Sequence, residues 1–285
     1  MVAANETVAV KDVGLGTAYE RWAIYDLVAR WGAAAASALE GPIDGMAGMP
    51  GLHLLPLARR GCRVTVAHPD AGALSRVEAV YARAGLSDRL ATTQRERVPE
   101  GPFDLVLGFN FHDRLPAGAW RSHISALAQA AARDLVIFAT HPRSYGTYLR
   151  RVVRTFERAR TPELFDHEAC EPEVMRKALG EHGTIVEERF VDCPWWPDLF
   201  VSAGETLTSA SRARLGANGG AVSTPYDWGP DRFPFATTSR PAELRRALRR
   251  HPTFDAAAPT VAGFFAHHRA FRVSRDGFAG HSSIP

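Results

Sequence analysis

The sequence predicts an α/β protein in which helices cover both faces of a doubly wound, mostly parallel sheet. Runs rich in β-branched and other apolar residues alternate along the first half of the chain with segments whose apolar residues recur at helical spacing. Some runs are apolar throughout, as strands buried on both faces are. Glycines follow several helical segments, where helices normally end. This alternation favours right-handed crossovers and a parallel sheet.

The expected elements follow one another closely in the first half of the chain. After a helix, a short apolar strand ends at Glu40, and each later strand is followed by a helix. We expect helices over 17–38, 52–60, 74–84 and 117–132, and strands over 62–68, 103–109 and 134–140.

The pattern loosens in the second half. Residues 202–238 are rich in Gly, Ser, Thr and Pro and predict a long ordered loop or a small lid, and the residues from 275 onward predict a frayed tail. Between them we expect helices over 148–159, 173–181 and 241–250, and strands over 184–191 and 264–274.

Composition and charge narrow the class of protein. The formal net charge is +3, from 34 basic and 31 acidic residues, so no basic face of the kind that binds nucleic acid is expected. The arginine-rich stretches 143–160 and 240–250 fit amphipathic helices with a solvated basic face. No segment has the roughly 20 apolar residues needed to span a membrane, and the N-terminus lacks a signal-peptide pattern. With three widely spaced cysteines, these features predict a cytoplasmic protein.

The glycine-rich run over 44–51 directly follows the short strand that ends at Glu40. Ligands of open α/β sheets bind at the carboxyl ends of the strands, and glycine allows the backbone to approach a cofactor closely. A tight turn with packing glycines explains the run equally well.

A larger pattern gives this run its context. The succession LEGPIDGMAGMPGLHLLPLARRGCRVTVAHPDAGAL, followed later by PEGPFDLVLGFNFHDRLP, resembles motif I, the second strand and the fourth strand of class I S-adenosylmethionine-dependent methyltransferases. The resemblance covers about residues 19–140, and FFAHHRAFRVS is similar to the closing hairpin strand of that family. It implies a Rossmann-like fold in which residues 1–145 form the S-adenosylmethionine-binding core. Residues 146–285 would complete the sheet and provide a substrate pocket or lid, within a single structural domain.

The resemblance also implies residues of the cofactor site. His68 stands where the family has the acid that binds the ribose, with Asp70 close by in another register, and Gln94 stands where an acid receives the adenine amine. A carboxylate accepts two hydroxyl hydrogen bonds whereas a neutral imidazole accepts one, so weaker ribose binding is expected. The implied cofactor-binding residues are Glu40, Gly45, Gly48, Gly51, His68, Gln94 and Asn110.

Catalytic and substrate-binding candidates lie at the same predicted edge of the sheet. His112 and His141 follow strands and are candidate general bases, although a capping or loop histidine explains each as well. Tyr19, Trp195 and Trp196 are candidate walls of the substrate pocket, with core or lid packing as the alternative. No metal site is expected, because neighbouring histidines on a strand point to opposite faces.

Together these features predict an S-adenosylmethionine-dependent methyltransferase that methylates an oxygen or nitrogen of a small molecule, with no nucleic-acid or membrane partner. A homodimer or a partner protein remains open. His68 and Gln94 support one alternative, a catalytically inactive methyltransferase-like partner or regulatory subunit. A nucleotide-linked oxidoreductase is disfavoured, because no acid follows the second strand and the glycine spacing differs from G-x-G-x-x-G.

Overall fold

The structure is a computed structural model that describes residues 15–43, 50–113, 115–116, 118–148, 169–194 and 253–276. The helices with labels are α2 (Leu15–Trp31), α3 (Leu55–Ala58), α4 (Ala71–Arg83), α5 (Trp120–Ala130), α7 (Pro172–Gly180) and α10 (Pro259–Phe265). The strands are β1 (Ser37–Glu40), β2 (Arg63–His68), β3 (Leu90–Gln94), β4 (Phe103–Phe109), β5 (Ala131–Thr140), β6 (Thr184–Val191) and β7 (His268–Ser274). Short 3-10 helices occupy Leu52–Leu54, Ser87–Arg89 and Phe111–Asp113.

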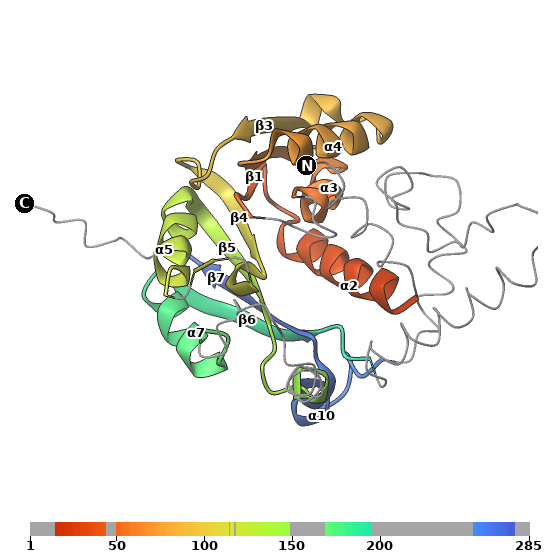
Figure 1. Cartoon of the computed structure of the whole chain (residues 1–285), viewed down its shortest axis with the longest axis vertical. Helices are drawn as coiled ribbons and strands as arrows, with labels where there is room; N and C mark the ends of the chain where they lie inside the picture. The colour runs from red at the N-terminus through yellow and green to blue at the C-terminus, as the bar shows by residue number, and fades with distance from the viewer. Residues whose placement is uncertain are drawn as a thin grey trace, which may run out of the picture.

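The described strands form one sheet in the order β3-β2-β1-β4-β5-β7-β6 (Figure 1). Strands β1 to β5 pair in parallel, and β7 lies antiparallel between β5 and β6. The predicted doubly wound, mostly parallel sheet is therefore confirmed. The chain runs outward from β1 to β3 and then returns to place β4 on the other side of β1. This switch point lies between the carboxyl ends of β1 and β4, where α/β sheets of this kind bind ligands.

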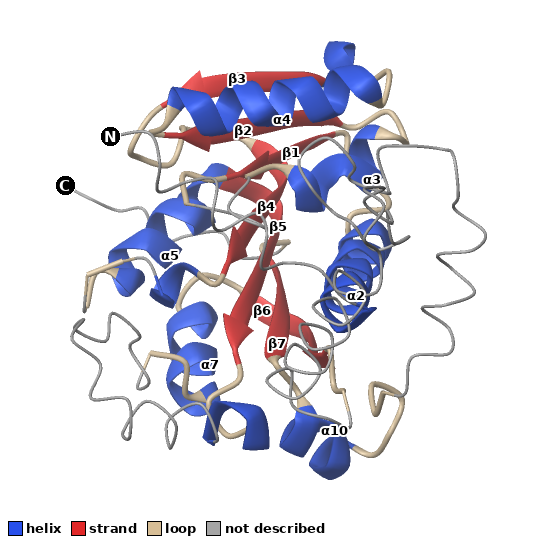
Figure 2. Ribbon diagram, turned by 45° about the vertical axis from the view of Figure 1, so that its right-hand side comes forward, coloured by secondary structure: helices blue, strands red, loops and turns tan. Residues whose placement is uncertain are grey.

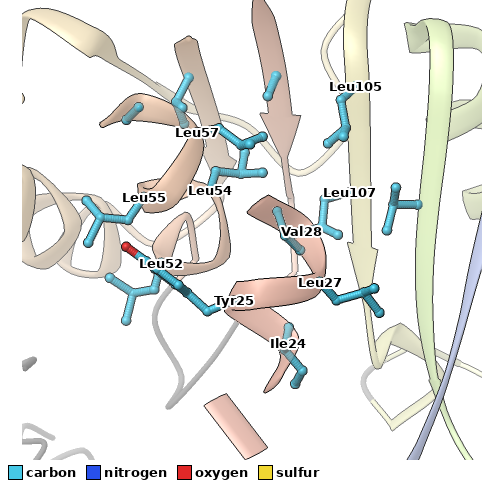
Figure 3. Packing of buried hydrophobic residues seen from close by; sticks show 14 of the residues in the cluster. Ile24, Tyr25, Leu27, Val28, Leu52, Leu54, Leu55, Leu57, Leu105 and Leu107 are labelled. Atoms are coloured by element: carbon cyan, nitrogen blue, oxygen red, sulfur yellow. The ribbon is translucent and has the colours of Figure 1, made fainter. Parts of the chain in front are cut away.

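Helices cover both faces of the sheet. Helices α2, α3 and α4 pack on one face, and α5 and α7 pack on the other (Figure 2). Successive residues of β5 alternate between the two cores: Val136 and Phe138 join the α2 side, whereas Leu135 and Ile137 join the α5 side. Figure 3 shows how leucines of the α3 region meet α2 and β4 in the first core. A strand buried on both faces is apolar on both, as residues 135–139 of β5 are.

Several predicted boundaries differ from the observed ones, and three of these differences have a visible cause. The helix expected over 17–38 ends at Trp31, because β1 begins at Ser37. Asp104 fixes that start: its carboxylate accepts the backbone N–H groups of Ala36 and Ser37 at 2.7 and 3.1 Å. Likewise, the helix expected to reach residue 132 ends at Ala130, because β5 begins one residue later. The strand expected from 264 begins at His268, since the preceding residues belong to α10.

Other predicted elements are placed as expected or lie outside the described residues. The strands expected over 103–109 and 184–191 are β4 and β6 with those bounds. Residues 145–148 are helical, so the helix expected from 148 begins earlier, and its continuation from 149 lies outside the described residues. The loop expected over 202–238 and the helix expected over 241–250 also lie outside them. Within the described part of the chain, no helix is long and apolar enough to cross a membrane.

Candidate functional site

The carboxyl edge of the sheet gathers most of the polar residues that the sequence singles out. Because β1 to β5 are parallel, their last residues lie along the same edge. β7 runs antiparallel, so its first residues reach that edge as well. The residues brought to this edge are Glu40, His68, Gln94, Asn110, His141, Asp192, His267 and His268.

Glu40 ends β1 as a buried carboxylate, only 2% exposed. Its Oε1 accepts a hydrogen bond from Nδ1 of His53 at 2.9 Å, and the imidazole ring of His53 lies 4.4 Å from the ring of Phe109 at the end of β4. The other oxygen, Oε2, is buried with no hydrogen-bond partner among the described residues. Sequence reasoning missed His53, although a histidine inside the buried apolar run LHLLPL was a usable signal.

A small pocket opens beside Glu40 at the switch point. Its walls come from the ends of β1 and β4 and from α5 and the 3-10 turn before it. The lining residues are Glu40, Gly41, Ile43, Leu107, Gly108, Phe109, Phe111 and His123. The pocket therefore lies where the fold predicts a ligand.

Gly51 closes the glycine-rich run in the left-handed region, with φ +81°. A Cβ at this position would lie 2.6 Å from Cγ2 of Val66, so the turn rests directly on β2. The hydroxyl of Tyr81 in α4 donates to the carbonyl of Gly51 at 2.9 Å and holds the turn from the other side. A side chain is excluded here by both conformation and space. Gly45 and Gly48 lie outside the described residues.

The ends of β2 and β3 carry no carboxylate directed at a ligand. Asp70 caps α4, its Oδ1 accepting the backbone N–H of Gly72 at 2.8 Å. The backbone N–H of Asp70 in turn donates to Nδ1 of His68 at 3.1 Å. Gln94 is exposed, and its Nε2 donates to the carbonyl of Pro69 at 3.0 Å. Asp70 thus caps the helix, and His68 and Gln94 are the last residues of β2 and β3.

Asn110 follows β4 with a left-handed backbone, φ +39°. Its N–H donates to the carbonyl of Phe138 at 2.9 Å, and its side-chain Nδ2 lies 3.3 Å from Nδ1 of His268. Nε2 of His268 lies 2.5 Å from Oε1 of Glu20 in α2. The amide Oδ1 of Asn110 is buried and has no partner in the described structure. Sequence reasoning excluded a metal site at the neighbouring histidines of this strand, of which His268 is one, and did not find Glu20.

The two candidate bases are both buried. His112 is 1% exposed and stacks on Phe111, with 4.2 Å between ring centroids. His141 is 3% exposed, and its ring contacts Phe190 edge-on. Burial, and then the charges of nearby arginines, lower the pKa of His141 to about 4, so this imidazole is neutral at pH 7. Packing is the observed environment of both histidines.

A carboxylate–histidine pair also joins β6 to β7. Nδ1 of His267 lies 2.6 Å from Oδ2 of Asp192, whose backbone has φ +57°. The hydroxyl of Tyr19 in α2 donates to Oδ2 of Asp255 and lies 3.1 Å from Oγ1 of Thr253. Burial and Asp255 raise the pKa of Tyr19 well above its usual value, so Tyr19 stays a neutral donor. Trp195 and Trp196 lie outside the described residues.

Comparison with known proteins gives similar solved structures but no related sequence. No protein-family model matches the chain, and no curated protein matches it. The magnesium protoporphyrin IX methyltransferase of Synechocystis PCC 6803, with bound SAH, is 19% identical over 61% of this chain and 78% of its own, with a TM-score of 0.46. A putative sarcosine dimethylglycine methyltransferase from Galdieria sulphuraria is 12% identical over 90% and 84%, with a TM-score of 0.48. The [4+2]-cyclase SpnF is 14% identical over 88% and 79%, with a TM-score of 0.47.

The fold rests on the strand order of the chain itself. A parallel sheet with its switch point between β1 and β4 and an antiparallel β7 inserted between β5 and β6 is a Rossmann-like fold. The chain thus has the fold that its resemblance to class I S-adenosylmethionine-dependent methyltransferases implied.

Proposed function

We propose that this chain is an S-adenosylmethionine-dependent methyltransferase that acts on a small-molecule acceptor. The observation that carries the proposal is a pair of buried acceptor oxygens near the switch point. Oε2 of Glu40 and Oδ1 of Asn110 have no hydrogen-bond partner among the described residues. A buried polar atom left in this state costs about 1–3 kcal/mol. A ligand with a cationic donor, such as the ammonium group of S-adenosylmethionine, would supply the missing hydrogen bonds.

The turn beside these oxygens suits the same ligand. Gly51 leaves the turn without a side chain, and Gly41, with φ +139°, would place a Cβ 2.2 Å from the carbonyl oxygen of Ala67. The backbone therefore runs close to the ends of β1 and β2, as a fold that binds its ligand against the backbone requires. The residues that would hold the methionine part are Glu40, Gly51 and Asn110, and we propose Gly45 and Gly48 of the same glycine-rich run with them.

This chain would bind the ribose of S-adenosylmethionine differently from the methyltransferases that it resembles. Because Nδ1 of His68 accepts the N–H of Asp70, a neutral His68 carries its proton on Nε2. His68 would then donate to a ribose oxygen, where a carboxylate would accept from the hydroxyls. Since Nε2 offers one hydrogen bond instead of two, we expect weaker ribose binding. Gln94 would accept from the adenine amine through its amide oxygen.

The bound cofactor would supply an electrophilic methyl group on its sulfonium, and the protein would chiefly align the acceptor. Alignment alone contributes much of the rate of such a displacement. His141, with a pKa lowered to about 4, is a weak base at pH 7. His141 is therefore proposed as a wall of the acceptor pocket, with Tyr19, Trp195 and Trp196, and His112 stays proposed as a general base. Methylation of an oxygen or nitrogen that is already nucleophilic fits this arrangement best.

Calorimetric titration with S-adenosylmethionine and its demethylated product tests the proposal. We expect the wild-type protein to bind with a dissociation constant on the order of micromolar, equivalent to roughly 8 kcal/mol. Glu40→Gln removes a carboxylate charge without changing shape, and we expect it to weaken binding at least about tenfold. Asp88→Asn is the matched control, because Asp88 is an exposed acid that pairs with the adjacent Arg89.

A second candidate function has one observation in its favour. Asp70 is committed to capping α4, so no carboxylate of β2 is left for a ribose. A methyltransferase-like partner or regulatory subunit without a cofactor would tolerate that loss. If the folded wild-type protein binds neither S-adenosylmethionine nor its product, the enzyme proposal is wrong and this second function is favoured.

A further inference from the structure

Glu20, His268 and Asn110 form a continuous hydrogen-bonded line across the carboxyl edge of the sheet. The line starts on α2, passes through the first residue of β7 and ends directly after β4. The side chain of His268 is 6% exposed and that of Glu20 is 26% exposed. Residues 248 positions apart are thereby joined where the proposed cofactor would lie.

With one proton on the imidazole, the chemistry of the line sets the direction of each hydrogen bond. A carboxylate only accepts, so Nε2 of His268 must carry a proton and donate it to Glu20. In the neutral imidazole, Nδ1 is then an acceptor, and it requires the NH₂ end of the Asn110 amide. The oxygen of that amide must therefore point away from His268. This accounts for the buried Oδ1 that has no partner among the described side chains.

The backbone of Asn110 leaves its side-chain amide few other orientations. Its left-handed conformation, φ +39°, is held by the hydrogen bond from its N–H to Phe138, and Phe109 packs against the ring of His268 with 5.6 Å between centroids. An unrestrained amide could turn either end toward a ligand. An amide whose NH₂ is held by His268 presents only its oxygen.

We infer that Glu20 and His268 are positioning residues that orient the Asn110 amide so that its oxygen accepts a hydrogen bond from the ammonium group of S-adenosylmethionine. The inference rests on the proposed function for the identity of the ligand. Neither Glu20 nor His268 needs to touch that ligand. Their role is to select a cationic donor over an anionic or acceptor group at this point of the site.

Nitrogen NMR of the wild-type protein tests the arrangement without any ligand. We expect a proton on Nε2 of His268 and none on Nδ1, and the signals are assigned by their loss in His268→Phe. A proton on Nδ1 would overturn the inference, because the amide would then turn its oxygen toward His268.

Calorimetry with S-adenosylmethionine tests the effect on binding. Glu20→Leu removes the acceptor, and we expect it to weaken binding about tenfold, or about 1.4 kcal/mol. Glu20→Gln keeps an oxygen for Nε2–H and should retain most of the affinity. Asp26→Leu is the control on the same helix, because Asp26 pairs only with the exposed Arg30 among the interactions described, and it should change nothing.

A double-mutant cycle separates positioning from a general loss of structure. Asn110→Ala should weaken binding as Glu20→Leu does, and the double variant should bind no more weakly than Asn110→Ala alone. Thermal unfolding confirms that each variant is folded. Full additivity, or a Glu20→Gln variant as weak as Glu20→Leu, would overturn the inference while leaving wild-type binding intact. Absence of wild-type binding would instead overturn the proposed function and the ligand assigned here.

Discussion

Histidines at the carboxyl edge of the sheet are held by carboxylates in three described pairs. Glu40 binds His53, Asp192 binds His267, and Glu20 binds His268. In each pair the carboxylate fixes which ring nitrogen carries a proton, and hence what the other nitrogen can do. These pairs join residues that are 13, 75 and 248 positions apart in sequence. No local pattern predicts which of these residues pair, so sequence reasoning found Glu40 without its partner His53, and it missed Glu20.

No carboxylate in the described part of the chain pairs with His141, and the burial of His141 makes a prediction about the pH dependence of stability. Its pKa is about 4 in the folded protein against 6.5 ordinarily, so between these values the unfolded chain binds a proton that the folded protein does not. Stability should therefore fall as the pH drops from about 6.5 to about 4 and level off below. At 1.36 kcal/mol per pKa unit, this group accounts for roughly 3 kcal/mol of that fall.

The variant His141→Leu isolates this contribution. We expect urea unfolding of the variant to show a pH dependence that is shallower than that of the wild type by roughly 3 kcal/mol between pH 7 and pH 4. Equal pH dependence in the two proteins would mean that His141 is not buried in the neutral form. His141 would then again be a candidate general base.

At the scale of elements, the start of the α3 region depends on the turn at Gly51. Gly51→Ala would strain a left-handed residue and drive a Cβ against Val66, whose β-branched side chain has little freedom to move. We expect a loss of about 2–4 kcal/mol in the free energy of unfolding, combining strain and overpacking. Chemical denaturation measures this loss.

Gly85→Ala is the matched control for that change. Gly85 also has a left-handed backbone, φ +69°, but a Cβ there would meet nothing within 4 Å. Gly85→Ala should lower the free energy of unfolding only by the strain of the left-handed conformation, about 1–2 kcal/mol. If the two variants lose equal stability, contact with Val66 contributes nothing and the turn can shift away from β2.

The elements themselves differ in how far the sequence predicts them. β4 and β6 are predicted with their observed bounds, because an apolar or alternating run stands between clear breakers. The end of α2 is not predicted correctly, because the alanines after Gly32 suit a helix as well as a turn. A tertiary contact decides the matter: Asp104, distant in sequence, binds the backbone at Ala36 and Ser37 and starts β1 there.

At the scale of the whole molecule, the alternation of elements predicts a parallel sheet but not how the chain closes it. The closing strand β7 pairs with both β5 and β6, and it brings His267 and His268 to the carboxyl edge. The sequence marks a last strand there, yet its position between β5 and β6 follows only from long-range pairing. Much of the candidate site therefore depends on an element near the end of the described chain.

Asp134 links this last strand to the rest of the sheet, and its replacement tests how strongly the closure stabilises the fold. The carboxylate is 1% exposed and accepts from Nε of Arg272 in β7 and from Nε of Arg133, each at 2.8 Å. Asp134→Asn keeps the shape and removes the charge. We expect it to lower the free energy of unfolding by about 2 kcal/mol, because hydrogen bonds to charged groups contribute about 1.5–3 kcal/mol.

The control is Asp88→Asn, whose exposed pair with Arg89 should contribute no more than about 1 kcal/mol. Because β7 separates β5 from β6, Asp134→Asn should weaken β7 and also raise hydrogen exchange in β5 and β6. Mass spectrometry under native conditions measures this exchange. Loss of protection confined to β7 would show that the strand opens on its own. Equal protection throughout the sheet would show that Asp134 contributes nothing to its closure, and that apolar packing of Phe271 and Val273 holds the strand in place.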